Sequence, residues 1–377
     1  MPWWDRLSYP AGVPTTAEQA ARVGRVRAVC IAASAALLMT FQGSVQNADS
    51  ATPVSATSDS AHARTSGECG HGHRKPGSHD PWGTCWPGAH NTGVRPGTSL
   101  RIITGDRTIS RNGKVIKGWD VSGCINVAAV GVTIENSKAR CVTLVSGSRA
   151  RYCHHGESDT IRRMTECTVV RGLSDNGDHR TNHPRLRIVN SVINCRGVPG
   201  HTGTGIGDRN INVVRTVVRQ CENGFDADSY MKIRDSYIHD LYNSVTGDPH
   251  TDGLQSAVGA HLVLVHNVFY GFTPPCPWPN DGSCNGTSAI NIGGQAGMST
   301  SRDTTLEHNL LAGGAYTLYC PMQRPTNFRI IQNYFSQVYS PRVGEYGPAD
   351  GCRKSGVRSR GNKRLAYASG HTRPLRP

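Results

Sequence analysis

One pattern of alternating apolar residues recurs between Val132 and Val338 and constrains this chain more than any other feature. Each copy has an apolar residue at every second position, then a small polar or amide residue, then more apolar alternation. The copies are VTIENSKARC from Val132, LRIVNSVINC from Leu186, INVVRTVVRQC from Ile211, MKIRDSYIHD from Met231, LVLVHNVFYG from Leu262, TTLEHNLLAG from Thr304 and FRIIQNYFSQ from Phe328. Because strand side chains alternate faces, each copy indicates two short strands around a bend.

The spacing of the bends predicts the architecture. The bend residues are Ser137, Ser191, Thr216, Ser236, Asn267, Asn309 and Asn333, at intervals of 54, 25, 20, 31, 42 and 24 residues. We read the 54-residue interval as holding a degraded copy near IRRMTEC. Coils of about 20 to 30 residues with longer excursions are too irregular for leucine-rich or propeller repeats and are typical of a parallel β-solenoid. We therefore expect an all-β fold.

An antiparallel β-sandwich would also show alternating strands. Two-residue hairpin turns are missing from the sequence, however, and the same order of polarity recurs in every copy. Both observations favour a chain whose strands always run the same way.

A further strand precedes the repeat copies and predicts a stacked row of outward-facing residues. Its third residue is apolar in every copy and would point inward, so the fourth would point outward. The expected row is Asn126, Gly207, Asp226, Gln255, Asn291 and Tyr319.

The cysteines indicate disulfides in an oxidising compartment. Of thirteen cysteines, one lies in the N-terminal apolar segment, and no two form a C-x-x-C pair of the zinc type. Cys141, Cys167, Cys195 and Cys221 are 26, 28 and 26 residues apart, so they should lie on adjacent coils. The expected pairs are Cys141–Cys167, Cys195–Cys221, Cys276–Cys284, Cys320–Cys352 and Cys69–Cys85, with Cys167–Cys195 left open.

The ends of the chain differ from its middle. Residues 1–51 carry arginines before an apolar run from Ala28 to Phe41, as a secretory signal peptide does, and the run is short for a membrane span. We expect a secreted, extracellular protein with no membrane contact after signal removal. Residues 52–85 read as a flexible linker, 86–352 as the β-solenoid domain, and 353–377 as a basic C-terminal tail with eight lysines and arginines, one histidine and no acids.

The charge balance points to an acidic partner. Lysine and arginine number 41 against 27 acids, a net charge of +14. Only seven of the basic residues are lysine, so the arginine excess can equally reflect genomic base composition. Secretion and the lack of an interleaved aromatic and basic groove argue against nucleic acid.

Four segments resemble a known family. They are WPGAHNTGVRPGTSLR from Trp86, NGKVIKGWDVSGCINV from Asn112, IRDSYIHDLY from Ile233 and HTDGLQ from His250. Together they resemble secreted actinobacterial right-handed parallel β-helix proteins of the pectate-lyase-like superfamily, over roughly residues 86–352. The resemblance implies a right-handed parallel β-helix. Members of this superfamily include polysaccharide lyases and glycoside hydrolases, so the resemblance implies one of these two activities.

The densest polar cluster lies between Asn223 and Gln255 and supplies candidates for a lyase. His250 is the candidate base for β-elimination on a uronic acid. Arg234, Lys232 and Arg209 are candidates to neutralise the substrate carboxylate. Asp226, Asp228 and Asp252 are the other catalytic candidates, and their oxygens could alternatively bind Ca²⁺, which is the cofactor that these residue types suit.

Three functions stay open on the sequence alone. The first expectation is a lyase acting on an anionic polysaccharide as a monomer. A glycoside hydrolase with paired Asp residues is the second, although the Asp-Asp pair and Gly-His-Gly of the polygalacturonase pattern are absent. The third is a non-catalytic carbohydrate-binding solenoid, since Asn126, Gln255, Asn291 and Tyr319 carry groups that bind sugars. The aspartates also fit local turns, which is the structural alternative for each of them.

Overall fold

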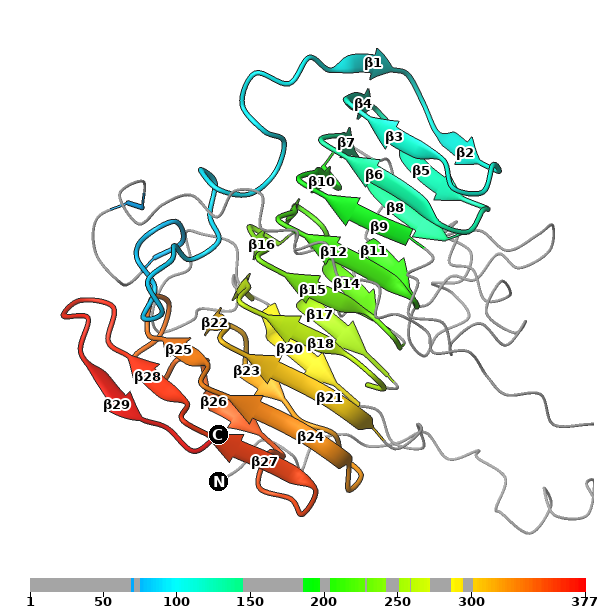
Figure 1. The fold of residues 1–377 in the computed structure, drawn as a ribbon. Helices are drawn as coiled ribbons and strands as arrows, with labels where there is room; N and C mark the ends of the chain where they lie inside the picture. The colour runs from blue at the N-terminus through cyan, green and yellow to red at the C-terminus, as the bar shows by residue number, and fades with distance from the viewer. Residues whose placement is uncertain are drawn as a thin grey trace, which may run out of the picture. The chain divides into compact units, whose positions relative to one another are not determined.

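Each turn of the backbone contributes one strand to each of three sheets, and successive turns stack in parallel (Figure 1). The computed structural model describes residues 69–70, 75–144, 186–196, 204–227, 229–241, 251–257, 259–271, 286–293 and 301–377. All of these belong to one compact unit, Ser60–Pro377. The predicted signal segment 1–51 lies outside the described residues.

We number the sheets in the order in which the chain visits them. Sheet 1 holds β1 (Arg101–Ile103), β4 (Trp119–Val121), β7 (Lys138–Ala139), β10 (Val192–Asn194), β13 (Val217–Arg219), β16 (Tyr237–His239), β19 (Val268–Tyr270), β22 (Leu310–Ala312), β25 (Tyr334–Ser336), β28 (Lys363–Leu365) and β29 (Thr372–Pro374). Sheet 2 holds β2 (Arg107–Ile109), β5 (Cys124–Val127), β8 (Cys141–Leu144), β11 (Thr204–Asp208), β14 (Asn223–Ala227), β17 (Thr251–Ser256), β20 (Gly286–Ile292), β23 (Tyr316–Tyr319) and β26 (Gly347–Asp350). Sheet 3 holds β3 (Val115–Lys117), β6 (Val132–Glu135), β9 (Leu186–Val189), β12 (Ile211–Val214), β15 (Lys232–Arg234), β18 (Val263–Val265), β21 (Arg302–Glu307), β24 (Thr326–Ile331) and β27 (Val357–Arg360).

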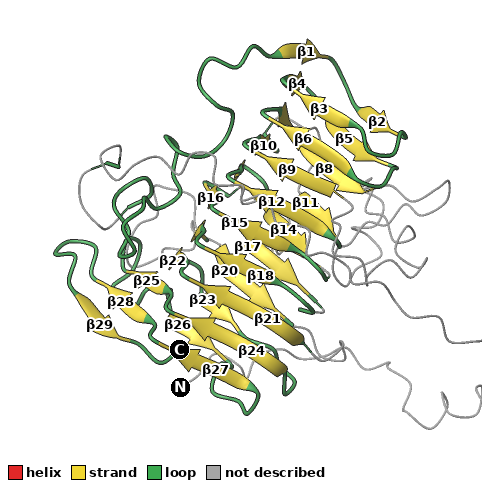
Figure 2. Ribbon diagram, viewed as in Figure 1, coloured by secondary structure: helices red, strands yellow, loops and turns green. Residues whose placement is uncertain are grey.

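This arrangement is the predicted parallel β-helix. Among the described strands every named pairing is parallel except that of β28 with β29. The described residues contain strands, turns and loops but no helix (Figure 2). No segment among them could therefore cross a membrane as a helix.

The interior is filled by aligned apolar residues from successive coils. Ile206, Phe225, Leu254 and Ile290 stand in register on neighbouring strands of sheet 2, and all are fully buried. Equivalent rows from sheets 1 and 3 face them, which gives one continuous core. Stacking coils therefore buries apolar surface that a single coil could not bury alone.

The predicted bend residues form a buried ladder between sheet 3 and sheet 1. The backbone N–H of Asn267 donates to Asn309 Oδ1, that of Asn309 donates to Asn333 Oδ1, and that of Asn333 donates to Asn362 Oδ1, each at 2.9 Å. The residue before each ladder position adopts a left-handed conformation, for example His266 with φ 54°. Two residues thus suffice for every one of these bends, because the ladder side chains satisfy the buried backbone groups of the next coil.

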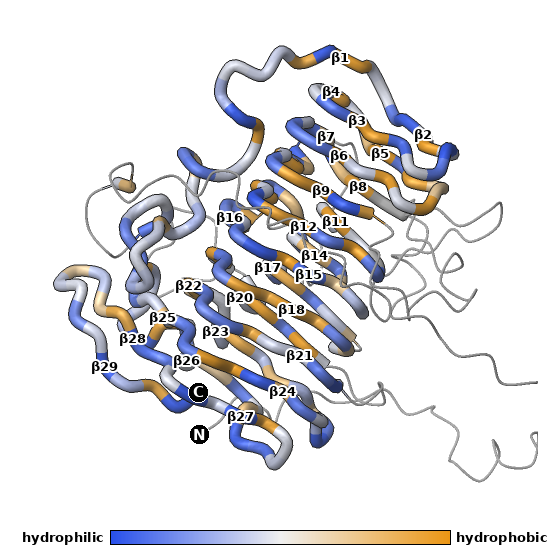
Figure 3. The backbone as a smooth tube through the Cα atoms, viewed as in Figure 1, coloured by the Kyte–Doolittle hydropathy of each residue, from blue (hydrophilic) through white to orange (hydrophobic). Residues whose placement is uncertain are grey.

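The outer face of sheet 1 is apolar and covered. Val268, Leu310 and Tyr334 stand in register on this face and are buried together with Trp86. Residues 75–98, which we call the N-terminal arm, contact this edge from Tyr334 to Asn136. Figure 3 shows apolar residues along the strands that the arm adjoins.

The structure confirms three predicted disulfides and corrects one. Cys69–Cys85, Cys195–Cys221 and Cys320–Cys352 are bonded. Cys141 bonds to Cys124 instead of Cys167, with the two Cα atoms 4.6 Å apart. The prediction was wrong because Cys124 and Cys141 are directly paired in sheet 2, one short coil of 17 residues apart. Cys167, Cys276 and Cys284 lie outside the described residues.

Two other expectations about the repeat are revised. Strand β6 pairs directly with β9, so no coil stands between these two strands in sheet 3. The predicted copy near IRRMTEC lies outside the described residues. Residues 353–377, which read as a tail in the sequence, contribute β27, β28 and β29 and complete the last coil.

Candidate functional site

The long connections between strands all adjoin sheet 2. The bends from sheet 3 to sheet 1 are one or two residues long, whereas the segments 145–185, 197–203, 242–250, 272–285 and 294–300 each lead into or out of a sheet 2 strand. Functional groups of solenoids and other scaffolds concentrate where loops are long. Because the arm covers the outer face of sheet 1, we expect a functional site on the outer face of sheet 2.

The predicted outward row lies on this face. Gly207 pairs with Asp226, Asp226 with Gln255, Gln255 with Asn291, and Asn291 with Tyr319. Asn126 stands further along the same register, next to Thr143, and Asp350 extends the row beyond Tyr319. The register of all six predicted positions is therefore confirmed.

Asp252 sits beside this row and is completely buried. The hydroxyl of Ser288, on the next strand, donates to Asp252 Oδ1 at 2.5 Å, and the backbone N–H of Asp252 donates to Asn223 Oδ1 at 3.0 Å. Asp252 Oδ2 is buried and has no hydrogen-bond partner among the described residues. A buried carboxyl oxygen without a partner is costly and therefore calls for a functional explanation.

Gly253, which follows Asp252, is tightly packed. A Cβ atom at Gly253 would lie 2.5 Å from the Ala289 carbonyl oxygen and 3.1 Å from Phe269 Cδ1 in the core, so only glycine fits there. The Asp252 carboxyl group is linked to the row by a hydrogen bond with Asn291 and by the effect of its charge on Tyr319.

Burial changes the acidity of this group. It raises the pKa of Asp252 from 3.8 to about 7, against smaller opposing effects of hydrogen bonds from Ser288 and Asn291. The pKa of Tyr319 is raised to about 12 by its own burial and by the negative charges of Asp252 and Asp350. Near neutral pH this face thus holds a carboxyl group that is about half protonated and a neutral phenol.

A second acidic residue lies on the neighbouring strand. Asp226 belongs to β14 and pairs with Gln255, three residues past Asp252. It is buried, with 8% of its surface exposed, and takes part in further interactions. The face therefore combines a carboxyl group of raised pKa with another carboxyl group on an adjacent coil.

The predicted basic residues fall in two places. Lys232 and Arg234 lie on β15 in sheet 3, exposed and away from the outward row of sheet 2. Arg209 directly follows β11 of sheet 2 and is half-buried. Two other candidates, His250 and Asp228, lie outside the described residues, although His250 directly precedes β17 and Asp228 directly follows β14 in the chain.

Tyr316 and Tyr346 continue the row beside Tyr319, and neither was among the predicted site residues. The Tyr316 ring packs edge-on against Tyr319, with centroids 5.5 Å apart, and lies 5.9 Å from the Tyr346 ring. Tyr346 is 59% exposed. Ser288 and Tyr316 could have been found by extending the outward register three residues back along each strand, whereas no sequence signal marks Tyr346.

No metal site is apparent at this face. Among the residues described here, no three His, Cys, Asp or Glu side chains come together in a way that would bind a metal ion. Asp228, one of the predicted Ca²⁺ ligands, is outside that set.

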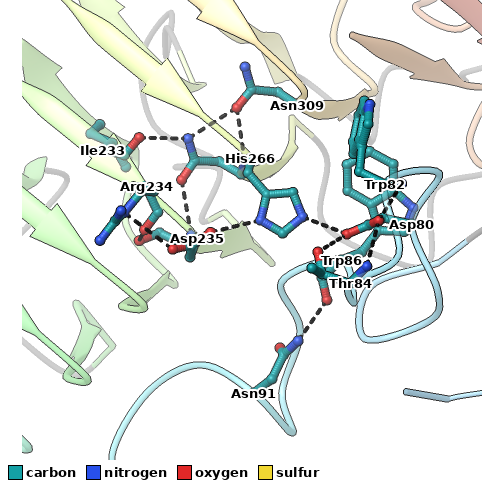
Figure 4. Close-up of polar contacts among 12 residues, drawn as sticks. Asp80, Trp82, Thr84, Trp86, Asn91, Ile233, Arg234, Asp235, His266 and Asn309 are labelled. Atoms are coloured by element: carbon teal, nitrogen blue, oxygen red, sulfur yellow. Dashed lines mark hydrogen bonds and ion pairs between the residues drawn. The ribbon is translucent and has the colours of Figure 1, made fainter. Parts of the chain in front are cut away.

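A second polar cluster joins the arm to the helix. His266 Nδ1 lies 2.7 Å from Asp235 Oδ1, and its Nε2 lies 2.9 Å from Asp80 Oδ2 (Figure 4). Trp86 stacks on the imidazole and Trp82 contacts its edge. Burial lowers the pKa of His266, but the two carboxylates outweigh this effect and raise it to about 9. Both ring nitrogens are occupied, so this cluster holds the arm in place and offers no free group for catalysis.

Comparison with known proteins gives no match. No protein-family model, no curated protein and no solved structure is significantly similar to this chain. The geometry of sheet 2 is therefore the basis for inferring a function.

Proposed function

We propose that this protein is a secreted enzyme that cleaves a polysaccharide along the outer face of sheet 2, with Asp252 as the proton donor. The observation that carries the proposal is the Asp252 carboxyl group. It is buried, one of its oxygens has no partner among the described residues, and its pKa is about 7. A carboxylic acid that keeps its proton near neutral pH can protonate a glycosidic oxygen as the bond breaks.

Hydrolysis is the reaction that these residues support best. It requires a second carboxyl group to activate water or attack the sugar, and Asp226 on the adjacent strand is the candidate. Strands lie about 4.8 Å apart and rise about 3.3 Å per residue, so an offset of one strand and three residues separates the two Cα atoms by about 11 Å. This separation is far from the about 5 Å between carboxyl groups of retaining enzymes and nearer to the roughly 6.5–9.5 Å of inverting enzymes, in which a water molecule lies between the second carboxylate and the sugar.

The row beside Asp252 suits a sugar chain. Gln255 and Asn291 offer amide donors and acceptors on successive coils, and Tyr319 adds an aromatic face. The row runs across the strands, so its groups repeat at each coil as the units of a polymer do. Tyr316 and Tyr346 continue this surface with further aromatic rings suited to packing against pyranose rings.

Elimination is the second candidate reaction. His250 precedes β17 and Arg209 follows β11, so a base and a cation both adjoin sheet 2 in the chain. Lys232 and Arg234 lie on sheet 3 and would not contact a substrate bound along the row.

The four disulfides among the described residues, together with the N-terminal signal pattern, support an extracellular protein of the pectate-lyase-like kind.

The test is an assay of purified protein on polygalacturonate, alginate, xylan and a soluble β-glucan. New reducing ends without new short-wavelength ultraviolet absorbance are the expected result and identify hydrolysis. Equal numbers of reducing ends and absorbing unsaturated ends would identify elimination instead. No cleavage of any polymer, combined with retention on an immobilised polymer, would leave a binding protein and overturn the enzymatic proposal.

A further inference from the structure

The outward row of sheet 2 contains no lysine or arginine. It takes one residue from each of the nine strands of this sheet, which Figure 1 shows stacked in order. In register these residues are Thr108, Asn126, Thr143, Gly207, Asp226, Gln255, Asn291, Tyr319 and Asp350. The side chains that the row offers to a ligand are therefore neutral or negative.

Tyr319 reports the sign of the charge near the Asp252 site. Burial raises the pKa of Tyr319 to about 12, the carboxylates of Asp252 and Asp350 add to this effect, and no described lysine or arginine opposes it. Asp350 is exposed and forms no ion pair with another described residue. A carboxylate on a sugar bound here would thus be repelled from both sides of Tyr319.

The basic residues that dominate the net charge lie on other faces. On the outer face of sheet 3, Arg187 and Lys232 flank Asn212, and Arg329 pairs with Arg358. Arg209 adjoins sheet 2 only where the chain leaves β11 for sheet 3. The net charge of the whole chain is therefore a poor guide to what binds along sheet 2.

The end of the row suits uncharged sugar rings. The Tyr316 ring lies 5.5 Å from that of Tyr319 and 5.9 Å from that of Tyr346, centroid to centroid, so three aromatic rings adjoin one another. Tyr346 is 59% exposed. Aromatic rings pack against the C–H faces of pyranose units, and the amides of Gln255 and Asn291 both donate to and accept from hydroxyl groups. Neither interaction requires a charge on the ligand.

We infer that the outward row of sheet 2 binds a neutral polysaccharide whose units carry no carboxylate. The inference deepens the proposed function and rests on it for cleavage, although binding itself requires no turnover. It also separates the two candidate reactions. Elimination removes a proton next to a uronic acid carboxylate, which a neutral polymer lacks, so hydrolysis is the reaction left for such a substrate.

The test uses one polymer in two charge states. The hydroxyethyl and carboxymethyl forms of the same soluble β-glucan, and of the same xylan, carry substituents of similar size that differ in charge. Equilibrium binding to wild type is measured at 4 °C, pH 8 and 0.15 M salt, where Asp252 is mostly ionised and exposed charges act over about 8 Å. We expect the hydroxyethyl form of at least one polymer to bind at least tenfold more tightly than its carboxymethyl form.

Two pairs of variants locate the binding. Tyr346→Ala should lower affinity for the neutral form at least fivefold, whereas Tyr367→Ala, which removes an exposed tyrosine that follows β28 of sheet 1, should change it less than twofold. Asp350→Lys should raise affinity for the carboxymethyl form at least fivefold. Asp120→Lys, on β4 of sheet 1, makes the same change in net charge and should alter this affinity less than twofold.

The opposite results are equally clear. Equal or tighter binding of the carboxymethyl forms that Tyr346→Ala abolishes would overturn the inference, as would failure of every neutral form to bind. Equal losses in Tyr346→Ala and Tyr367→Ala would overturn the location. Neutral polymer that binds without gaining reducing ends would leave this inference and remove the enzymatic proposal. Cleavage of polygalacturonate in preference to both neutral polymers would do the reverse.

Discussion

His266 and Asp80 lie 2.9 Å apart although 186 residues separate them in the chain. This contact fastens the N-terminal arm across the coils, because Asp80 belongs to the arm and His266 to the bend before β19. Asp80 has no exposed side-chain surface, and its carboxylate also accepts hydrogen bonds from Trp82 and Thr84. Although burial alone would raise the pKa of Asp80, these bonds together hold it below its usual value.

The stability of the protein should therefore fall at alkaline pH. The folded-state pKa of His266 is about 9 against an ordinary 6.5, so its contribution is complete below pH 6.5 and is lost as the pH rises through 9. The shift corresponds to about 3 kcal/mol. We expect His266→Gln to lower the melting temperature at pH 6 and to match wild type at pH 10. The control His308→Gln, which removes a ring stacked on Trp82, should give no such convergence. A His266→Gln deficit that is the same at both pH values would refute this account.

Breaking the buried amide ladder should be costly. Asn309 accepts from the backbone and side chain of Asn267 and donates to the Leu264 carbonyl oxygen. Asn309→Ala leaves several buried groups unpaired, and we expect a loss of about 3 kcal/mol in urea unfolding. Asn309→Ser should lose less, because Ser236 fills the equivalent position and its Oγ accepts the Thr216 backbone N–H. Equal losses for the two variants would contradict the ladder as the cause.

The Cys124–Cys141 bond should stabilise the first coils. It closes a segment of 17 residues, and loop-closure entropy then predicts about 3 kcal/mol lost when both cysteines are replaced by serine. Peptide mapping without reduction should recover Cys124 linked to Cys141. Recovery of a peptide that links Cys141 to Cys167 would contradict the Cys124–Cys141 bond and support the pair predicted from cysteine spacing.

The Asp252 carboxylate should lower the free energy of unfolding at neutral and alkaline pH. Its pKa is raised, so the folded state binds the proton more tightly than the unfolded state, and stability declines as the pH rises from about 4 to 7. Asp252→Asn should therefore raise the melting temperature by several degrees at pH 8 and leave it unchanged at pH 3.5. The control Asp350→Asn, at the exposed end of the row, should show no such gain. A variant that is destabilised at pH 8 would indicate that the carboxylate has a structural role.

Much of the scaffold could be predicted because each copy of the repeat places equivalent residues at the same position in its strand. Asp226, Gln255 and Asn291 hold the same position after an inward apolar residue, so strand alternation alone places them side by side. The Cys124–Cys141 bond escaped prediction because one coil is shorter than its neighbours. The arm escaped because Asp80 and Trp86 lie in a segment with the composition of a linker, and nothing local indicates that their partner is His266. The acidity of Asp252 depends on burial by the folded chain, which no spacing reveals.

The most direct test of catalysis on sheet 2 is kcat/KM as a function of pH for wild type and Asp252→Asn on the polysaccharide that wild type cleaves best. With Asp252 as proton donor, wild-type kcat/KM should fall as the pH rises through about 7, and Asp252→Asn should lose at least a hundredfold while remaining folded. His250→Ala, the companion variant for the elimination alternative, should then retain turnover. Activity of folded Asp252→Asn within a fewfold of wild type would contradict the central claim and move the active site away from this residue.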